Sequence, residues 1–355
     1  MAVIDPAFWD GRRVLLTGHS GFKGTWLSLW LTSLGASVTG ISSGRPAPAD
    51  SLHSITRADE GCELIAADIR DAQAIAEAFA SAKPEVVIHL AAQPLVRRAY
   101  ADPLATYEIN VMGTVNLLEA VRATPSVRAV VIVTSDNCYA ISDLGRPYRE
   151  DDPLGGSDPY ASSKAAAELV TAAYRSSYFT EPDAPRLATA RSGNVIGAGD
   201  SSEGRLIPDL VRSALTGKPA EIRNPDAIRP WQHVLNPISG YLLLAEALCS
   251  SADYAEPWNF APDREDERPV RWIADRLVEL WPDRIVWELD EGANPAEAHE
   301  LRIDSAKAHE RLGWRLIWHL DDALQRVIEW QIALEHGSDM RAVALGQIAM
   351  FTAAV

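Results

Sequence analysis

Residues 13–24 read Arg13-Val-Leu-Leu-Thr-Gly18-His-Ser-Gly21-Phe-Lys-Gly24, and this stretch decides the fold. An apolar run that ends in glycine is typical of a buried strand, and apolar residues at helical spacing follow from Thr25 to Leu34. Strand, glycine turn and helix together predict a dinucleotide site, because glycines allow close backbone approach and a helix N-terminus attracts a pyrophosphate. We therefore expect Gly18, Gly21 and Gly24 to bind cofactor phosphates.

Strands and helices alternate over the first half of the chain. Strands are expected at 37–42, 63–67, 85–92, 129–133 and 187–191, with helices at 71–81 and 106–123 between them. This alternation predicts an α/β protein with a Rossmann-type, doubly wound parallel sheet. Later residues alternate less strictly, which predicts a smaller mixed α/β substrate-binding lobe. We expect a dinucleotide-binding domain of residues 1–190 and 235–252 and a second, substrate-binding lobe of residues 191–234 and 253–355.

The end of the second strand bears on the choice of cofactor. It reads Ile41-Ser-Ser-Gly-Arg45 and lacks the Asp or Glu that would hold an adenosine ribose 2′-hydroxyl. Arg45 suits either a 2′-phosphate or a solvent-facing loop, so these residues leave NAD and NADP open. Asp68 and Ile69 follow the next strand and are placed to meet the adenine edge.

Small and polar residues mark the carboxyl ends of later strands, where ligands bind in such sheets. Leu90-Ala91-Ala92 would let a cofactor lie against the backbone, and Gln93 follows at the edge. Asn110, near the start of a long helix, would either contact the cofactor or cap a turn. His89, inside its strand, is expected to be a packed core residue.

Catalytic groups are expected after the strand at 129–133. Thr134, Ser135 and Asp136 leave the sheet at the ligand-binding edge. Tyr160 and Lys164 lie four residues apart at the start of a helix and therefore share one face. An ammonium beneath the phenol would lower its pKa from about 10 and make it a usable acid and base.

Composition excludes several other functions. The 355 residues include 33 Lys and Arg against 49 Asp and Glu, a formal charge of -16, which argues against nucleic acid or an anionic membrane as partner. Cys62, Cys138 and Cys249 are too scattered for a disulfide framework or a zinc site, so we expect no metal and a reducing cytoplasm. No apolar run reaches membrane-spanning length.

These motifs resemble the extended short-chain dehydrogenase/reductase family, in which the glycine turn, Leu90-Ala-Ala, Asn110, Ser135 and the Tyr160/Lys164 pair occur in this order. Within it, the chain is similar to the CDP-glucose 4,6-dehydratase branch over nearly its whole length. The segments that carry this similarity are Thr17-Gly-His-Ser-Gly-Phe-Lys-Gly-Thr-Trp26, Ala92-Gln-Pro-Leu-Val-Arg97, Asn110-Val-Met-Gly-Thr114, Leu154-Gly-Gly-Ser-Asp-Pro-Tyr160, Arg229-Pro-Trp-Gln-His-Val234 and Leu312-Gly-Trp314.

The resemblance implies a tightly held NAD rather than NADP, a CDP-sugar substrate, and a homodimer or higher homo-oligomer. The implied cofactor-binding residues are Gly18, Gly21, Phe22, Lys23, Gly24, Asp68, Ile69, Leu90, Ala91, Ala92, Gln93, Asn110, Thr134, Tyr160 and Lys164. The implied substrate-binding residues are Gln93, Asn194, Arg205, Leu206, Arg229, Trp231, His233 and Arg302. The three arginines suit a diphosphate, which favours bidentate guanidinium, or else form surface ion pairs, and the Trp231 indole suits a base or sugar. The resemblance also brings residues 298–302 to the substrate.

In the family reaction, Tyr160 takes the C4 hydroxyl proton, Ser135 holds the developing carbonyl and Asp136 protonates the departing C6 hydroxyl. A raised Asp136 pKa would keep that acid protonated.

One position departs from this family pattern. The residue after Asp136 is a base in the relatives, Lys in this branch and Glu in others, but here it is Asn137, whose amide cannot accept the C5 proton. Loss of a general base costs about 100- to 10,000-fold in rate. Either another group or water takes the proton, or the protein is a nucleotide-sugar epimerase or 4-keto reductase. A third alternative is a cofactor-binding protein without turnover, which the intact Ser135, Asp136, Tyr160 and Lys164 argue against.

Overall fold

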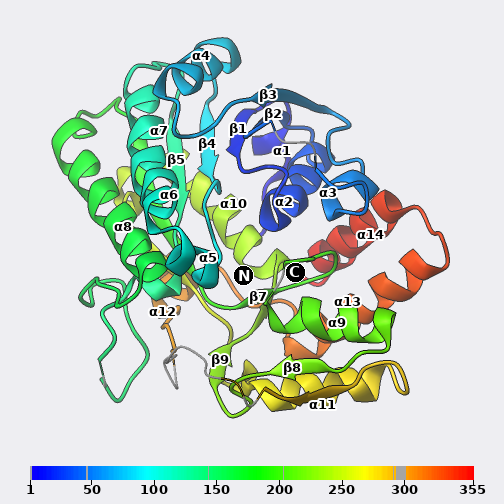
Figure 1. Cartoon of the computed structure of the whole chain (residues 1–355). Coiled ribbons are helices and arrows are strands. Elements are labelled where there is room, and N and C mark those ends of the chain that lie inside the picture. Colours follow the sequence, from blue (N-terminus) through cyan, green and yellow to red (C-terminus); the bar gives the residue numbers. More distant parts are fainter. Residues whose placement is uncertain (1, 45–46, 143, 203, 291, 293–300) are drawn as a thin grey trace.

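Seven parallel strands form the central sheet (Figure 1), in a computed structural model that describes residues 2–44, 47–142, 144–202, 204–290, 292 and 301–355. The strands are β1 (Arg13–Thr17), β2 (Ser37–Ser42), β3 (Cys62–Ala66), β4 (Val86–His89), β5 (Ala129–Val133), β6 (Arg186–Ser192) and β11 (Pro257–Phe260). Their order is β11-β6-β5-β4-β1-β2-β3. The order reverses at β1, so the carboxyl ends of β1 and β4 flank a crevice in which such sheets bind ligands. The predicted doubly wound sheet is confirmed.

Helices cover both faces of this sheet, because its strands are apolar on both sides. Along β1, Val14 and Leu16 join the core that contains Trp26, whereas Leu15 joins the opposite core with Phe79. The first core is covered by α2 (Phe22–Ser33), α10 (Leu235–Ser250) and α14 (Met340–Ala353), and the second by α4 (Ala72–Ala82), α7 (Gly113–Arg122) and α8 (Pro159–Tyr178). Continuous apolar strands of this kind are typical of parallel sheets buried on both faces.

A smaller mixed α/β lobe lies below the sheet in Figure 1. Its helices α9 (Leu206–Thr216), α11 (Val270–Leu280) and α13 (Leu320–Glu335) share a core that includes Leu210, Leu277 and Leu324. Its short strands pair two by two, as β7 (Val195–Ile196) with β10 (Gln232–His233), β8 (Ala220–Ile222) with β13 (Trp287–Leu289), and β9 (Ile228–Pro230) with β12 (Glu267–Pro269). The expected second lobe is present.

Two elements expected in that lobe belong to the sheet instead. β11 pairs with β6 through Trp258 and Ala190, so it is the edge strand of the central sheet. α14 packs on α2, with the Phe351 ring 5.6 Å from that of Trp30. Assigning all of residues 253–355 to the second lobe is therefore wrong, because the chain returns to the sheet twice.

The long helix expected over residues 106–123 is divided in three. α6 (Pro103–Tyr107) leads into a π-helical turn, η1 (Glu108–Met112), which continues as α7. The remaining helices are α1 (Pro6–Trp9), α3 (Leu52–Ile55), α5 (Val96–Ala101), α12 (Ala306–Arg311) and the 3-10 turns η2 (Asp136–Cys138), η3 (Ala252–Tyr254) and η4 (Arg264–Asp266). Among the described residues, none of the helices has both the length and the apolar character to cross a bilayer.

Candidate active site

The glycine turn has the backbone geometry of a dinucleotide site. Gly18 has a φ of +71°, and a Cβ there would lie 2.7 Å from the Ala91 nitrogen. A Cβ on Gly24 would lie 2.1 Å from the Gly18 oxygen, so the turn and α2 meet backbone to backbone. Gly21 is the N-cap of α2 and supplies no side-chain cap, which leaves N–H groups of the first turn for an anion. The residues present fit a cofactor pyrophosphate.

Tyr160 and Lys164 are fixed by the start of α8. Asp158 caps the helix and accepts hydrogen bonds from the backbone nitrogens of Tyr160 (2.8 Å) and Ala161 (3.0 Å), while Pro159 occupies the first turn. This start turns Tyr160 and Lys164 to the buried face, and Ser135 lies close enough to the phenol to lower its pKa. The predicted hydroxyl, phenol and lysine therefore converge after β5.

The expected effect of Lys164 on Tyr160 is wrong for this structure. Burial raises the pKa of Tyr160 to about 12, opposed by the Ser135 hydrogen bond and reinforced by the Asp136 charge. The Lys164 ammonium donates to the Val133 carbonyl (3.4 Å), and burial lowers its own pKa to about 8. Loss of solvent around the phenol outweighs any favourable charge.

Asp136 has the environment expected of an acid. Only 2% of the residue is exposed, and burial raises its pKa to about 6, against a smaller lowering by the Ser135 hydrogen bond. Ser135 Oγ donates to Oδ1 (3.0 Å), whereas Oδ2 has no hydrogen-bond partner among the described residues. A Cβ on Gly193 would come within 3.2 Å of Oδ2, so this glycine packs closely against the buried carboxylate. The predicted rise in pKa is confirmed.

Asn137 is turned toward its neighbours rather than offered as a base. Its side-chain nitrogen donates to Asp136 Oδ1 (3.0 Å) and Ser135 Oγ (3.4 Å). Its backbone nitrogen also donates to Ser135 Oγ (3.2 Å). Asn137 thus acts as a donor to the acid and the hydroxyl beside it.

Lys23 reaches across the cleft, a contact that sequence reasoning missed. Its Nζ donates to Ser192 Oγ (2.8 Å) and Tyr241 Oη (3.1 Å), on β6 and α10. Burial lowers its pKa to about 7, and its charge in turn lowers that of Asp136. Ser192 and Tyr241 belong to no motif, because they meet Lys23 only when distant segments fold together.

Gln93 and Asn110 hold the fold at this edge. Asn110 Oδ1 accepts from the Gln93 backbone nitrogen (2.8 Å), and its Nδ2 donates to the Gln93 carbonyl (3.1 Å) and Ser163 Oγ (2.9 Å). Gln93 donates to Thr106 Oγ1 (3.0 Å) and accepts from the Leu95 nitrogen (2.7 Å). Both side-chain amides are hydrogen-bonded inside the protein, where they position this edge of the sheet, and their contacts with ligands stay predictions.

Other predicted cofactor residues lie along the same crevice. Asp68 forms an ion pair with Arg70 (2.7 Å), and a Cβ on Gly113 would meet the Ile69 side chain at 2.8 Å. The ring of Phe22 packs close to Gly197, because a Cβ on that glycine would lie only 3.1 Å from the ring. Leu90, Ala91 and Ala92 follow β4 beside the glycine turn. His89 is a buried core residue with a pKa lowered to about 3 by burial, as expected.

The Thr134 side chain is hydrogen-bonded to a buried ion pair, that of Glu168 with Arg191. Its hydroxyl donates to Glu168, whose carboxylate also binds Arg191 (2.8 Å) and Thr189 (2.7 Å). Arg191 also donates to Tyr139 Oη (2.8 Å). This network ties α8 to the end of β5 and to β6, and it was not foreseen.

Among the three predicted arginines, Arg205 forms an ion pair with Asp200 (3.5 Å) and Arg302 forms one with Glu267. Arg205 precedes α9, which begins at Leu206, and its charge lowers the pKa of Tyr160 and of Lys23. Arg229 lowers the pKa of Asp136 in the same way. Arg302 lies 2.9 Å from Glu267, as the ion-pair alternative predicts, and residues 298–300 lie outside the described residues.

Two predicted substrate contacts are wrong. Trp231 is buried in the core of the second lobe, and its Nε1 donates to the Arg268 carbonyl (2.9 Å). His233 is fully buried, accepts from the Leu235 nitrogen (3.2 Å) and packs edge-on against Trp318. Neither ring presents a surface to a ligand. Asn194 lies next to this segment, because its backbone carbonyl accepts a hydrogen bond from the Gln232 backbone nitrogen (3.0 Å).

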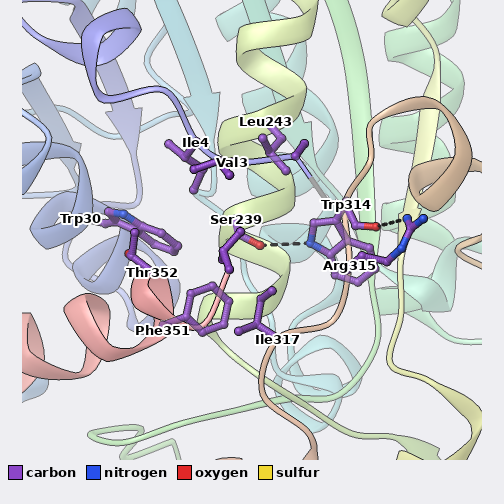
Figure 2. Close-up of a pocket in the computed structure, with 12 residues that line it drawn as sticks. Val3, Ile4, Trp30, Ser239, Leu243, Trp314, Arg315, Ile317, Phe351 and Thr352 are labelled. Carbon is purple, nitrogen blue, oxygen red and sulfur yellow. Dashed lines mark hydrogen bonds between the residues drawn. The ribbon is translucent and has the colours of Figure 1, made fainter.

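A small apolar cavity lies elsewhere, between the two ends of the chain (Figure 2). Its volume is about 20 Å³, and Trp30, Trp314 and Phe351 contribute to its walls. Figure 2 shows the Trp314 Nε1 donating to Ser239 Oγ (3.1 Å). A water needs about 10–15 Å³ of such space, so this cavity has room for about one water and is no substrate site.

The sequence model of the NAD dependent epimerase/dehydratase family matches residues 14–255, which include the glycine turn, Ser135, Tyr160 and Lys164. The chain belongs to this family. In this epimerase/dehydratase family, the chain is 46% identical to the CDP-glucose 4,6-dehydratase of Salmonella typhimurium over 99% of both proteins. It is 36% identical to the UDP-glucose 4-epimerase of Mycolicibacterium smegmatis over 59% of this chain and 65% of that protein.

Solved structures share the epimerase/dehydratase fold. The crystal structure of the dTDP-glucose 4,6-dehydratase DesIV from Streptomyces venezuelae, with NAD bound, superposes with a TM-score of 0.78. The superposition covers 93% of this chain and 99% of that one, at 24% identity. This likeness concerns the arrangement of the sheet and the second lobe.

Proposed function

We propose that the protein is an NAD-dependent nucleotide-sugar 4,6-dehydratase that converts CDP-glucose to CDP-4-keto-6-deoxyglucose. One observation carries the proposal: a buried carboxylic acid with a pKa near 6, Asp136, stands beside the hydroxyl of Ser135 and the phenol of Tyr160. An epimerase needs the phenol but no acid for a departing hydroxyl. The full-length identity to a CDP-glucose 4,6-dehydratase supports the same substrate.

Each residue has a role that follows from its surroundings. Tyr160 takes the place of the phenol that accepts the C4 hydroxyl proton in the family reaction, although burial raises its pKa to about 12 here, and Ser135 beside it holds the developing carbonyl oxygen. Asp136 donates its proton to the departing C6 hydroxyl, for which the unpartnered Oδ2 is the free atom. The glycine turn at Gly18, Gly21 and Gly24 would hold NAD, which would supply the hydride chemistry at C4 and C6.

The C5 proton has no evident acceptor in Asn137, because its amide donates to Asp136 and Ser135. We propose that water or a neighbouring side chain takes this proton. The arginines at 205 and 229, whose charges act on the catalytic groups, support a diphosphate between the sheet and the second lobe. We assign NAD to the sheet and the CDP-sugar to the second lobe.

An epimerase or 4-keto reductase remains the second candidate, and the missing base at Asn137 is the observation that favours it. Both reactions use Tyr160, and neither eliminates water. The identity to a UDP-glucose 4-epimerase is lower and covers less of the chain.

We also propose a homodimer in the cytoplasm. Leu104, Met112 and Leu169 are exposed on α6, η1 and α8, which pack together, and such an apolar face suits an isologous interface. All three cysteines are free thiols, which suits a reducing compartment.

The reaction can be tested with purified protein, NAD and CDP-glucose in deuterated water. A 6-deoxy-4-keto product with deuterium at C5 is expected, detected by NMR and mass spectrometry. A product that keeps its C6 hydroxyl would exclude dehydration and favour the second candidate.

A further inference from the structure

We infer that Asp59, held by His53, is the carboxylate that recognises the adenosine ribose of the cofactor and disfavours a 2′-phosphate. The inference rests on the proposed use of NAD and assigns the specificity that the end of β2 lacks. Asp59 lies in the turn between α3 and β3. In the usual pattern the carboxylate that binds this ribose comes at the end of β2, so the sequence position of Asp59 gives no signal.

The position of Asp59 is set by two histidines. His53 Nε2 lies 2.8 Å from Asp59 Oδ1, and His19 Nε2 lies 3.6 Å from the same oxygen. The two imidazoles meet edge to face with centroids 5.2 Å apart. Gly40 makes room for this arrangement, because a Cβ there would lie 2.6 Å from the His19 ring. The carboxylate is therefore held from two sides while remaining partly exposed.

The cluster opens into a cavity of about 540 Å³. His19 and Ser20 line it from the glycine turn, Ser42 from the carboxyl end of β2, and Ala66 from that of β3. This is the edge at which a doubly wound sheet places the adenosine half of a dinucleotide. Figure 1 shows α3 beside α2, on the flank of the sheet formed by β2 and β3.

The charges around the cavity favour hydroxyls over a phosphate. Asp59 and Glu60 both line it, and the one arginine among its described walls, Arg57, already pairs with Glu60 (3.0 Å) and Asp339 (3.1 Å). Arg45, a candidate for a 2′-phosphate, lies outside the described residues. A carboxylate accepts hydrogen bonds from a ribose diol and repels a phosphate dianion.

His19, His53 and Asp59 also have ligand atoms within 4.8 Å of one another, as in a three-residue metal site. We favour ribose, because the cluster forms the wall of a nucleotide-sized cavity next to the glycine turn. Zinc binding is the competing outcome of the test.

The test measures nucleotide affinity by calorimetry on protein freed of bound nucleotide. NAD, its analogue with 2′-deoxyadenosine, and NADP are compared for the wild type, Asp59→Ala, Asp59→Asn and the control Glu77→Ala, an exposed acid on α4. We expect wild type to bind NAD about 10- to 100-fold more tightly than the 2′-deoxy analogue, from a hydrogen bond to a charged group. In Asp59→Ala the affinities for NAD and the 2′-deoxy analogue should become equal, and the preference for NAD over NADP should become smaller. Glu77→Ala should change neither comparison.

Asp59→Asn keeps the size of the side chain and a hydrogen-bond acceptor, so it should retain part of the ratio if Asp59→Ala unfolds the turn. His53→Gln should lower the ratio without removing it, as expected of a positioning residue. Equal losses for NAD and the 2′-deoxy analogue, or none, would overturn the inference. So would stoichiometric zinc binding that Asp59→Ala abolishes while the nucleotide ratio persists.

These outcomes are separable from the proposed function. Protein that shows the expected ratio yet leaves CDP-glucose unchanged would contradict the dehydratase assignment alone. Protein that dehydrates CDP-glucose but binds NAD and its 2′-deoxy analogue equally would contradict only the role of Asp59.

Discussion

The side-chain amide of Asn137 donates a hydrogen bond to Asp136 Oδ1 across 3.0 Å, so the residue in the position of the family's base serves its acid. This bond leaves Oδ2 of the buried carboxylate as the atom without a partner among the described residues. The site is therefore equipped to donate a proton to a leaving hydroxyl, while proton removal from C5 depends on another group.

Replacing Asn137 by Lys should supply the missing base. The rate of 4-keto-6-deoxy product formation should rise by at least about tenfold, because a positioned general base contributes about 100- to 10,000-fold. The matched variant Asn137→Gln keeps an amide and should show no gain. An unchanged rate in Asn137→Lys, with correctly folded protein, would mean that proton removal does not limit turnover.

Tyr160→Phe should abolish turnover while the cofactor still binds. In the proposed reaction the phenol exchanges a proton with the C4 hydroxyl, so its loss should reduce kcat about 1,000-fold or more. Calorimetry with NAD separates this effect from misfolding, and Tyr178→Phe, at the exposed end of α8, serves as control. Appreciable activity in Tyr160→Phe would remove the phenol from the mechanism.

Asp136→Asn should inactivate the enzyme yet stabilise it at alkaline pH. The pKa of Asp136 rises from 3.8 to about 6 on folding, so the folded protein holds this proton more tightly than the unfolded chain. That contribution to the free energy of unfolding is complete below 3.8 and is lost as the pH rises through about 6. At pH 8 the free energy of unfolding of the variant should exceed that of the wild type by up to about 3 kcal/mol, because each pKa unit corresponds to about 1.36 kcal/mol.

Urea denaturation at pH 4, 6 and 8 measures this difference, which should shrink toward pH 4. The control Asp226→Asn changes an exposed carboxylate and should show no such trend. A constant difference at all three pH values would show that the charge of Asp136 is not what destabilises the native state.

Glu168→Gln should destabilise the protein strongly. Glu168 and Arg191 are almost fully buried and bonded at 2.8 Å, and breaking a buried pair costs about 3–5 kcal/mol because one charge is left uncompensated. Asp226→Ala removes one partner of the exposed pair with Arg271 and should cost less than about 1 kcal/mol. Similar losses in the two variants would mean that the buried network contributes nothing special beneath the site.

Local patterns in the sequence determine much of the fold. The glycine turn at Gly18, Gly21 and Gly24 depends on backbone conformation within a few residues, and Asp158 and Pro159 start α8 by contacts inside one turn. Alternating apolar strands and helices also predict the parallel sheet from local patterns, because the spacing of apolar residues within each segment indicates whether it is a strand or a helix. The family resemblance placed Ser135, Asp136 and Tyr160 correctly at one edge.

Only the tertiary structure decided what surrounds those groups. Trp231 and His233 look like ligand contacts in the sequence, but Trp231 is buried in the core of the second lobe and His233 packs against Trp26 and Trp318. Burial raises the pKa of Tyr160, and the packing of α2 against β6 brings Lys23 to Ser192. Neither effect can be read from the residues next to Tyr160 or Lys23 in the sequence. The sequence by itself determined the sheet, the glycine turn and the candidate groups after β5 and at the start of α8, because these follow from neighbouring residues. The tertiary structure decided solvation, charge and the placing of Asp59 by His53, because these arise between segments that are distant along the chain.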